Sequence, residues 1–162
     1  MTTPATTDLS DGHPEAQVCD PVFSVFGGNA RFCGPITTLK VFEDNTLIKQ
    51  AVESPGEGRV LVVDAGASPR CGMVGGNLAV SAARNGWAGL VVYGYVRDVD
   101  ELAEQPVGIR ALGAMPRKSE RGLHSGQAGR PVTFAGVRFT EGAWLCADRD
   151  GIVVLPSAPD GG

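Results

Sequence analysis

The stretch that decides the fold is residues 58–102, GRVLVVDAGASPRCGMVGGNLAVSAARNGWAGLVVYGYVRDVDEL. It contains two apolar, β-branched runs, Val60–Val63 and Leu90–Tyr95, each of a length typical of a buried strand. Between them, a segment with helical spacing begins near Gly76 and ends before Gly86, because glycine commonly follows the end of a helix. Two strands around one helix predict a β-α-β unit with parallel strands.

A β-α-β crossover places the turn before the helix and the end of the second strand at the same edge of the sheet. We therefore expect the turn Gly75–Leu78 to lie beside Arg97 and Asp98, which follow the second strand. Backbone N–H groups at a helix start attract anions, a guanidinium binds a carboxylate through paired hydrogen bonds, and an aspartate can hold a divalent cation. Together they predict a site for a small ligand that carries a carboxylate.

Length and composition favour a single α/β domain over residues 1–162. A chain of 162 residues with 43% hydrophobic content can bury one core but is short for two ordinary domains. Its 23 glycines and 11 prolines fall between short apolar runs, so we expect many turns and few, short helices. The small, polar residues 1–7 and 157–162 are expected to be flexible ends.

Charge and hydropathy limit the partners that the chain is expected to bind. The formal net charge is −4, and the densest basic group, Arg117, Lys118 and Arg121, has no interleaved aromatic residues. Direct binding to nucleic acid is therefore not expected. No apolar run approaches the length of a membrane span, and the N-terminal residues do not resemble a signal peptide. We expect a cytoplasmic protein that binds no membrane.

Further elements are expected on both sides of the β-α-β unit. The alternating run Ile36–Phe42 predicts a strand, and Asn45–Ser54 has the spacing of a helix. Residues 132–139 and 144–155 each predict a hairpin, whereas the polar, glycine-rich segment 117–130 predicts a loop. The expected fold is therefore a three-layer or barrel-like α/β domain with mixed parallel and antiparallel strands.

The cysteines carry no local pairing signal. Cys19, Cys33, Cys71 and Cys146 are widely separated and form no C-x-x-C pair, and no histidine stands at the spacing of a zinc ligand. The sequence therefore predicts neither a zinc site nor a disulfide framework. We expect all of these residues to be buried, reduced thiols.

Several common catalytic classes lack their residues in this sequence. Gly75-Gly76 has neither the spacing of a dinucleotide-binding turn nor the Gly-Lys-Ser/Thr of a nucleotide phosphate loop. His13 and His124 lie in polar segments without the motifs of a serine hydrolase or a zinc protease. The lysines are not placed as a Schiff-base lysine would be, which argues against lysine-based aldolase chemistry.

The residues alone leave two interpretations of Arg97-Asp98 open. Asp98 can hold a metal, or it can cap a following helix together with Glu101, because this spacing is also that of a capping box. Arg97 can bind a ligand at the sheet edge, or it can be an ordinary surface arginine. The Gly75-Gly76 pair can serve anion binding or only close packing of the helix on the sheet.

Four segments, taken in order, resemble a known family over nearly the whole chain. They are FSVFGGNARFCGPITTLKVFEDN (23–45), GRVLVVDAGAS (58–68), NGWAGLVVYGYVRDVDEL (85–102) and ADRDGIVVLP (147–156). The family is that of the regulator of ribonuclease E activity A, which also contains 4-hydroxy-4-methyl-2-oxoglutarate aldolases. The resemblance implies a single swivelling β/β/α-type domain assembled as a homotrimer or a dimer of trimers.

The resemblance also implies roles for the residues of the glycine turn and the Arg-Asp pair. The implied reaction is a metal-dependent retro-aldol cleavage of a 4-hydroxy-2-oxo acid to pyruvate, with decarboxylation of oxaloacetate as a side activity. The implied catalytic residues are Arg97 and Asp98, with Asp98 as the ligand of Mg²⁺ or Mn²⁺. The implied substrate-binding residues are Gly75, Gly76, Asn77, Leu78 and Arg97.

One departure keeps a second function open. Catalytic members of the family carry an aspartate where this chain has Gly76. The alternative implied by the resemblance is a non-catalytic regulator that binds and inhibits a ribonuclease E-type endonuclease. Its partner would then be a protein, whereas the partner of the lyase would be a small 2-oxo acid.

Overall fold

The structure, a computed structural model, describes residues 3–122 and 126–159. The helices are α1 (Thr6–Gly12), α2 (Thr46–Val52), α3 (Gly76–Arg84) and α4 (Val99–Glu104). The strands are β1 (Gln17–Val18), β2 (Ser24–Val25), β3 (Phe32–Lys40), β4 (Val60–Asp64), β5 (Gly72–Val74), β6 (Gly89–Val96), β7 (Gly108–Ala114), β8 (Gln127–Ala128), β9 (Val132–Phe134), β10 (Val137–Phe139), β11 (Trp144–Asp148) and β12 (Gly151–Leu155).

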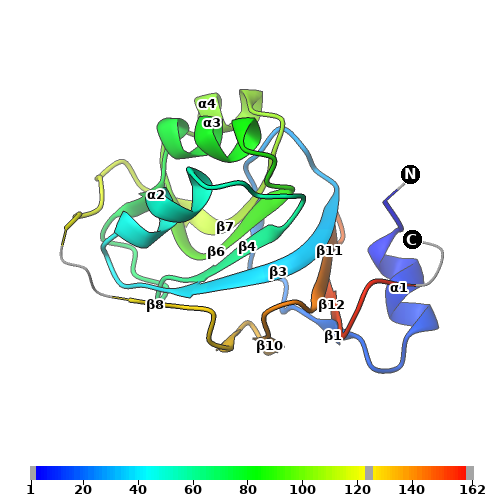
Figure 1. Cartoon of the computed structure of the whole chain (residues 1–162). Coiled ribbons are helices and arrows are strands. Elements are labelled where there is room, and N and C mark those ends of the chain that lie inside the picture. Colours follow the sequence, from blue (N-terminus) through cyan, green and yellow to red (C-terminus); the bar gives the residue numbers. More distant parts are fainter. Residues whose placement is uncertain (1–2, 123–125, 160–162) are drawn as a thin grey trace.

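Most strands belong to one mixed sheet of order β1-β12-β11-β3-β4-β6-β7-β2, with β5 beside β6 and β8 beside β3. The centre, β3-β4-β6-β7, is parallel, whereas β1, β12 and β11 continue it as an antiparallel arm. Helices α2, α3 and α4 lie together on one side of this sheet, and the β10 region lies on the other (Figure 1). The predicted α/β class and the parallel β4–β6 pair are confirmed.

Strand β4 is buried at every position because both of its faces are covered. Leu61 and Val63 pack into the core formed with α2 and α3. Val60 and Val62 point to the opposite face and pack into the core that includes the β9–β10 hairpin. Because both faces are buried, the sequence of β4 is a continuous apolar run and not an alternation of apolar and polar residues. In the described part of the chain, no helix is long and apolar enough to cross a membrane.

The glycine turn does not follow β4 directly, as the simple β-α-β prediction has it. The short strand β5 comes first and pairs in parallel with the end of β6, joining Gly72 to Tyr95 and Val74 to Val96. Helix α3 therefore begins beside the end of β6 rather than at the end of β4. The pattern Gly-Met-Val is too short to be recognised as a strand from sequence, yet it sets the position of the predicted site.

A buried arginine fixes the β7 side of the sheet to the antiparallel arm. Arg110 is 2% exposed, and its guanidinium lies over the Phe32 ring. It donates hydrogen bonds to the carbonyl oxygens of Ala30 and Asp148. Burial lowers the pKa of Arg110 to about 10, which leaves the side chain charged at neutral pH. The backbone carbonyl oxygens stabilise this buried positive charge by accepting hydrogen bonds from it.

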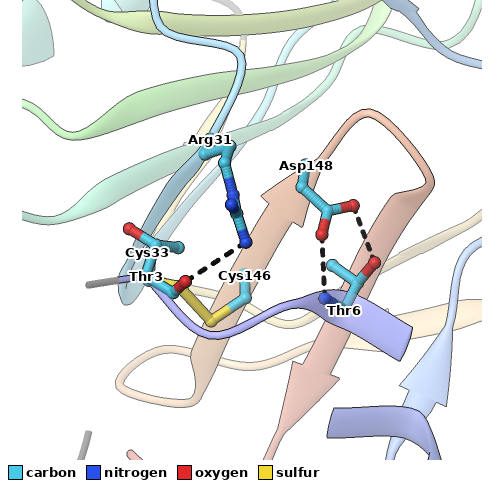
Figure 2. The surroundings of a disulfide bond; sticks show 6 residues. All are labelled: Thr3, Thr6, Arg31, Cys33, Cys146 and Asp148. Atoms are coloured by element: carbon cyan, nitrogen blue, oxygen red, sulfur yellow. Dashed lines mark hydrogen bonds between the residues drawn. A yellow bond between two sulfur atoms is a disulfide. The ribbon is translucent and has the colours of Figure 1, made fainter. Parts of the chain in front are cut away.

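The N-terminal helix α1 packs on the antiparallel arm, where Leu9 contacts a small core that contains Cys146 and Val153. The backbone N–H and the hydroxyl of Thr6 donate to the Asp148 carboxylate at 2.8 and 2.7 Å (Figure 2). The predicted flexibility of residues 1–7 is therefore wrong for Thr6, which is buried and paired. Residues 1–2 and 160–162 lie outside the described residues.

Two of the cysteines form a disulfide, so the prediction that all four are reduced is wrong. Cys33 of β3 and Cys146 of β11 stand directly opposite each other in the antiparallel register and are bonded (Figure 2). They are 113 residues apart in sequence, and only the tertiary pairing of the strands brings them together. Cys19 and Cys71 are free and buried, as predicted, and burial raises the pKa of both thiols.

The disulfide predicts a redox-dependent stability. Closing a loop of this length restricts the unfolded chain, so the double variant Cys33→Ser/Cys146→Ser should lose about 2–4 kcal/mol of unfolding free energy. Denaturant unfolding without reductant measures this loss, and reductant should lower the stability of the wild type alone. Thiol titration of the unfolded, unreduced protein should detect Cys19 and Cys71 only. Titration of all four thiols would contradict the bond.

The contact between α1 and Asp148 predicts an acid-sensitive stability. Burial alone would raise the pKa of Asp148, but hydrogen bonds from Thr6 and Asp150 outweigh it and leave the pKa below its ordinary 3.8. The stabilisation is therefore complete above pH 3.8 and is lost as the pH falls through the lower folded value. Asp148→Asn should flatten the fall of unfolding free energy in this acid range. The exposed Asp150→Asn is the control, and equal acid curves for both variants would contradict the assignment.

Candidate active site

A cavity of about 370 Å³ lies between the start of α3 and the chain that follows β7. Every residue that the sequence assigns to the site lines it, namely Gly75, Gly76, Asn77, Leu78, Arg97 and Asp98. The opposite wall consists of residues 118–121, with Asn45 and Gly72 completing the lining. The structure thus brings the predicted residues together and adds a wall that the sequence did not indicate.

Glycines make room for the Arg-Asp pair at the end of β6. The Arg97 N–H donates to the Val74 carbonyl at 2.9 Å, which holds the pair beside β5. A Cβ atom on Gly75 would stand 2.7 Å from Asp98 Oδ2, and one on Gly72 would stand 3.0 Å from Arg97 Cβ. Both contacts are closer than most Cβ atoms make, so a side chain at either position would displace the pair. The absence of side chains at these positions therefore lets the backbone approach the pair closely.

Asp98 stands at the N-cap position of α4, but its side chain caps α3. Its backbone is left-handed, with φ 60° and ψ 46°, and its side chain makes no capping bond to α4. Instead, Asp98 Oδ2 accepts a hydrogen bond from the Gly76 N–H at 2.9 Å. The capping box with Glu101 is therefore wrong, because the left-handed residue directs the carboxylate towards the neighbouring helix. Aspartate is among the few residues that tolerate this conformation.

Two polar atoms in residues that line the cavity are buried without a partner among the described residues. They are Nε of Arg97 and Oγ of Ser119. An unpaired buried donor costs about 1–3 kcal/mol, so such groups commonly mark a place where a ligand completes the hydrogen bonding. Arg97 is partly buried, which separates it from an ordinary surface arginine. Its orphaned nitrogen fits a bound carboxylate or ketone oxygen.

Glu101 lies near the site, although the sequence did not indicate it as a residue that could face a ligand. Its carboxylate lies against Gly76, in the space that a side chain at position 76 would enter. Glu101 thus places a second carboxylate at the start of α3, next to the bond between Asp98 and Gly76. Its spacing from Asp98 was available in the sequence but was interpreted as a capping box. The space beside Gly76 is therefore occupied by a carboxylate from α4.

The opposite wall is held by backbone pairing to two distant segments. The Gly72 N–H donates to the Arg117 carbonyl at 2.7 Å, and the Asn45 N–H donates to the Glu120 carbonyl at 3.2 Å. In addition, Arg121 Nε donates to Asn45 Oδ1 at 3.0 Å. The segment was predicted only as a polar loop, because irregular chain has no periodic pattern from which its partners could be inferred. His124 and Ser125 lie outside the described residues.

The charges of the lining suit an anionic ligand beside one cation. Arg97, Lys118 and Arg121 supply positive charge, whereas Asp98 and Glu120 supply negative charge. The Ala79 N–H makes the first helical bond of α3, to the Gly75 carbonyl at 3.1 Å. The preceding N–H groups of Asn77 and Leu78 therefore have no partner within the helix and favour negative charge there.

The donor set fits a weakly held, hydrated metal rather than a closed metal cage. Within residues 3–122 and 126–159, no group of three or more His, Cys, Asp or Glu side chains is arranged to hold a metal. Asp98 uses Oδ2 for the Gly76 N–H, which leaves Oδ1 as the oxygen available to a cation. Mg²⁺ commonly binds through one or two carboxylates and keeps several waters. Asp98 is thus compatible with Mg²⁺ or Mn²⁺ and incompatible with a tetrahedral structural zinc site.

Relatives of known sequence match the chain from end to end. The family model described as RraA-like, Aldolase/RraA, matches residues 6–154. A protein of Burkholderia mallei (strain SAVP1) with the provisional name 4-hydroxy-4-methyl-2-oxoglutarate aldolase is 53% identical over 160 residues. The match covers 95% of this chain and 96% of that protein.

Solved structures share the same fold. The RNA-processing inhibitor RraA from Thermus thermophilis has a TM-score of 0.95 and 48% identity, covering 99% of this chain and 97% of that one. A structure from Geobacillus kaustophilus HTA426, named S-adenosylmethionine:2-dimethylmenaquinone methyltransferase, has a TM-score of 0.93 and 40% identity, covering 96% of both chains. The expected resemblance is confirmed, and the chain belongs to the Aldolase/RraA family.

Proposed function

We propose that the protein is a divalent-metal-dependent lyase. It cleaves 4-hydroxy-2-oxo acids such as 4-hydroxy-4-methyl-2-oxoglutarate to pyruvate and decarboxylates oxaloacetate as a side activity. The observation that carries the proposal is the presence in one cavity of Asp98, at the start of α3, and of Arg97, whose Nε is buried without a partner in the described part of the chain. The provisional aldolase name of a relative with 53% identity supports the same reaction class.

The start of α3 would bind the 2-oxo acid end of the substrate. The N–H groups of Asn77 and Leu78 precede the first helical bond and can donate to a carboxylate. The Arg97 guanidinium would bind the oxygens of the same end and stabilise the negative charge that develops there during cleavage. A divalent cation on Asp98 would supply Lewis acidity toward the 2-oxo group when it is bound.

Cleavage breaks the bond between C3 and C4, and its electron pair stays with the pyruvate end. The hydroxyl on C4 must lose its proton in the same reaction, so a base is required. The candidate bases are Glu120, which lines the cavity, and Glu101, whose carboxylate lies against Gly76. Decarboxylation of oxaloacetate also leaves an electron pair on C3 of pyruvate, so the groups that stabilise this negative charge would serve both reactions. In both reactions C3 then takes up a proton, which in the cleavage the base can return.

The decisive test separates the charge of Asp98 from its capping role. Asp98→Asn keeps an oxygen for the Gly76 N–H but lacks the negative charge, so it should fold normally and lose metal-dependent pyruvate release by about 100-fold or more. Asp98→Ala should lose activity and, in addition, about 0.5–2 kcal/mol of stability. Coupled pyruvate assays with Mg²⁺ and with chelator, together with denaturant unfolding, measure both effects.

A matched control for this test is available on α4. Asp100→Asn removes the same charge from an exposed residue that does not line the cavity, and it should leave activity unchanged. Wild-type rates of metal-dependent pyruvate release in the Asp98→Asn variant would contradict the lyase proposal. An equal loss of activity in the Asp100→Asn variant would show that removing any negative charge near α4 lowers activity. It would contradict a specific role of Asp98.

A second candidate function is inhibition of an RNA-processing enzyme. It is favoured by the 48% identity and the TM-score of 0.95 with the RNA-processing inhibitor of Thermus thermophilis. We propose that the protein would then bind a ribonuclease E-type endonuclease of its own host. RNA cleavage by that enzyme should slow on addition of the protein, and the Asp98→Asn variant should inhibit equally well. Absence of both binding and inhibition would remove this function for that partner.

A further inference from the structure

The wall opposite α3 carries an arginine that is positioned by a buried asparagine. Asn45 is 6% exposed, and its Nδ2 donates to the Met73 carbonyl of β5 at 3.1 Å. Its Oδ1 accepts from Arg121 Nε at 3.0 Å. Arg121 is thus tied through Asn45 to the same strand that positions the glycine turn. This arrangement fixes one side of the guanidinium of an otherwise exposed residue.

The two Nη groups of Arg121 have no partner among the described residues and can bind a ligand. Among the described residues, neither Nη atom of Arg121 makes a hydrogen bond or an ion pair with a carboxylate. The two Nη groups of an arginine match the two oxygens of a carboxylate and can bind them together. Arg121 also lines the cavity, so a ligand in the cavity can reach it.

The cavity therefore has two cationic poles, contributed by different segments of the chain. The first pole is Arg97, at the end of β6, and the second is Arg121 with Lys118, in the segment that follows β7. Glu120 shares the second wall but leaves it with net positive charge. Ser119 also lines the cavity and has a buried hydroxyl without a partner among the described residues. A ligand with a single carboxylate can neutralise only one of these poles.

We propose that Arg121 determines specificity for 2-oxo acids with a second, distal carboxylate. It binds that carboxylate through its Nη groups, while Arg97 and Asp98 hold the 2-oxo acid end. The identity of that end depends on the proposed lyase function, but the two-pole recognition does not depend on turnover. The site then favours dicarboxylic over monocarboxylic 2-oxo acids of the same length.

A pair of non-cleavable ligands isolates the distal carboxylate. 2-Oxoglutarate and 2-oxovalerate have the same five-carbon chain and the same 2-oxo acid end, but only the first ends in a carboxylate. Titration calorimetry with Mg²⁺ present should find that the wild type binds 2-oxoglutarate at least about tenfold more tightly, in the range of a charged hydrogen bond. Arg121→Gln should remove this preference and leave the affinity for 2-oxovalerate unchanged.

Two further variants test whether geometry or only charge is responsible. Arg121→Lys keeps the charge but lacks both the Nε bond to Asn45 and the paired donors, so it should restore only part of the preference. Arg117→Gln removes the same charge four residues away from a side chain that does not line the cavity. It should bind both ligands like the wild type.

The outcomes separate this proposal from the lyase proposal. Equal weakening of both ligands by Arg121→Gln, or equal effects of Arg117→Gln and Arg121→Gln, would overturn the specificity role. So would a wild type that binds 2-oxoglutarate no better than 2-oxovalerate, even if it releases pyruvate. A protein that shows the Arg121-dependent preference but releases no pyruvate would sustain the specificity role and overturn the lyase.

Discussion

The hydrogen bond from the Gly76 N–H to the Asp98 carboxylate is the contact on which the site depends. It joins the start of α3 to the end of β6, and it requires a left-handed backbone at Asp98. Glycine at position 75 favours this bond, because a Cβ there would stand 2.7 Å from Asp98 Oδ2 and would push the carboxylate away. The backbone geometry at Asp98 costs stability in general and is retained where the surrounding structure enforces it. Here, the enforcing contact also shapes the cavity.

The part of the site at the start of α3 could be predicted, because local sequence patterns determine it. The apolar runs of β4 and β6 and the glycine that ends α3 gave the β-α-β unit, and the topology of such units placed Arg97 and Asp98 beside the glycine turn. How these residues come to lie beside the glycine turn could not be predicted from the sequence. It depends on β5, which is three residues long and acquires its strand geometry only from pairing with β6.

The rest of the site depends on contacts between residues that are far apart in sequence. The Lys118–Arg121 wall is irregular and takes its position from backbone bonds to Gly72 and Asn45, so no periodicity in its own residues reports it. The capping box failed for a related reason, since the spacing between Asp98 and Glu101 is correct but a single left-handed residue redirects the carboxylate. A sequence pattern gives the spacing between residues, whereas these features depend on the direction that the chain and its side chains take.

The disulfide between β3 and β11 constrains how the molecule is made. Cys33 and Cys146 are separated by 113 residues, which a ribosome needs roughly 6–23 s to synthesise at ordinary rates. Throughout that interval the first cysteine has been synthesised and its partner does not exist. Oxidation to the native pair is therefore a post-translational step that records the docking of the C-terminal arm. A chain truncated before β11 would leave the Cys33 thiol on β3 without its partner.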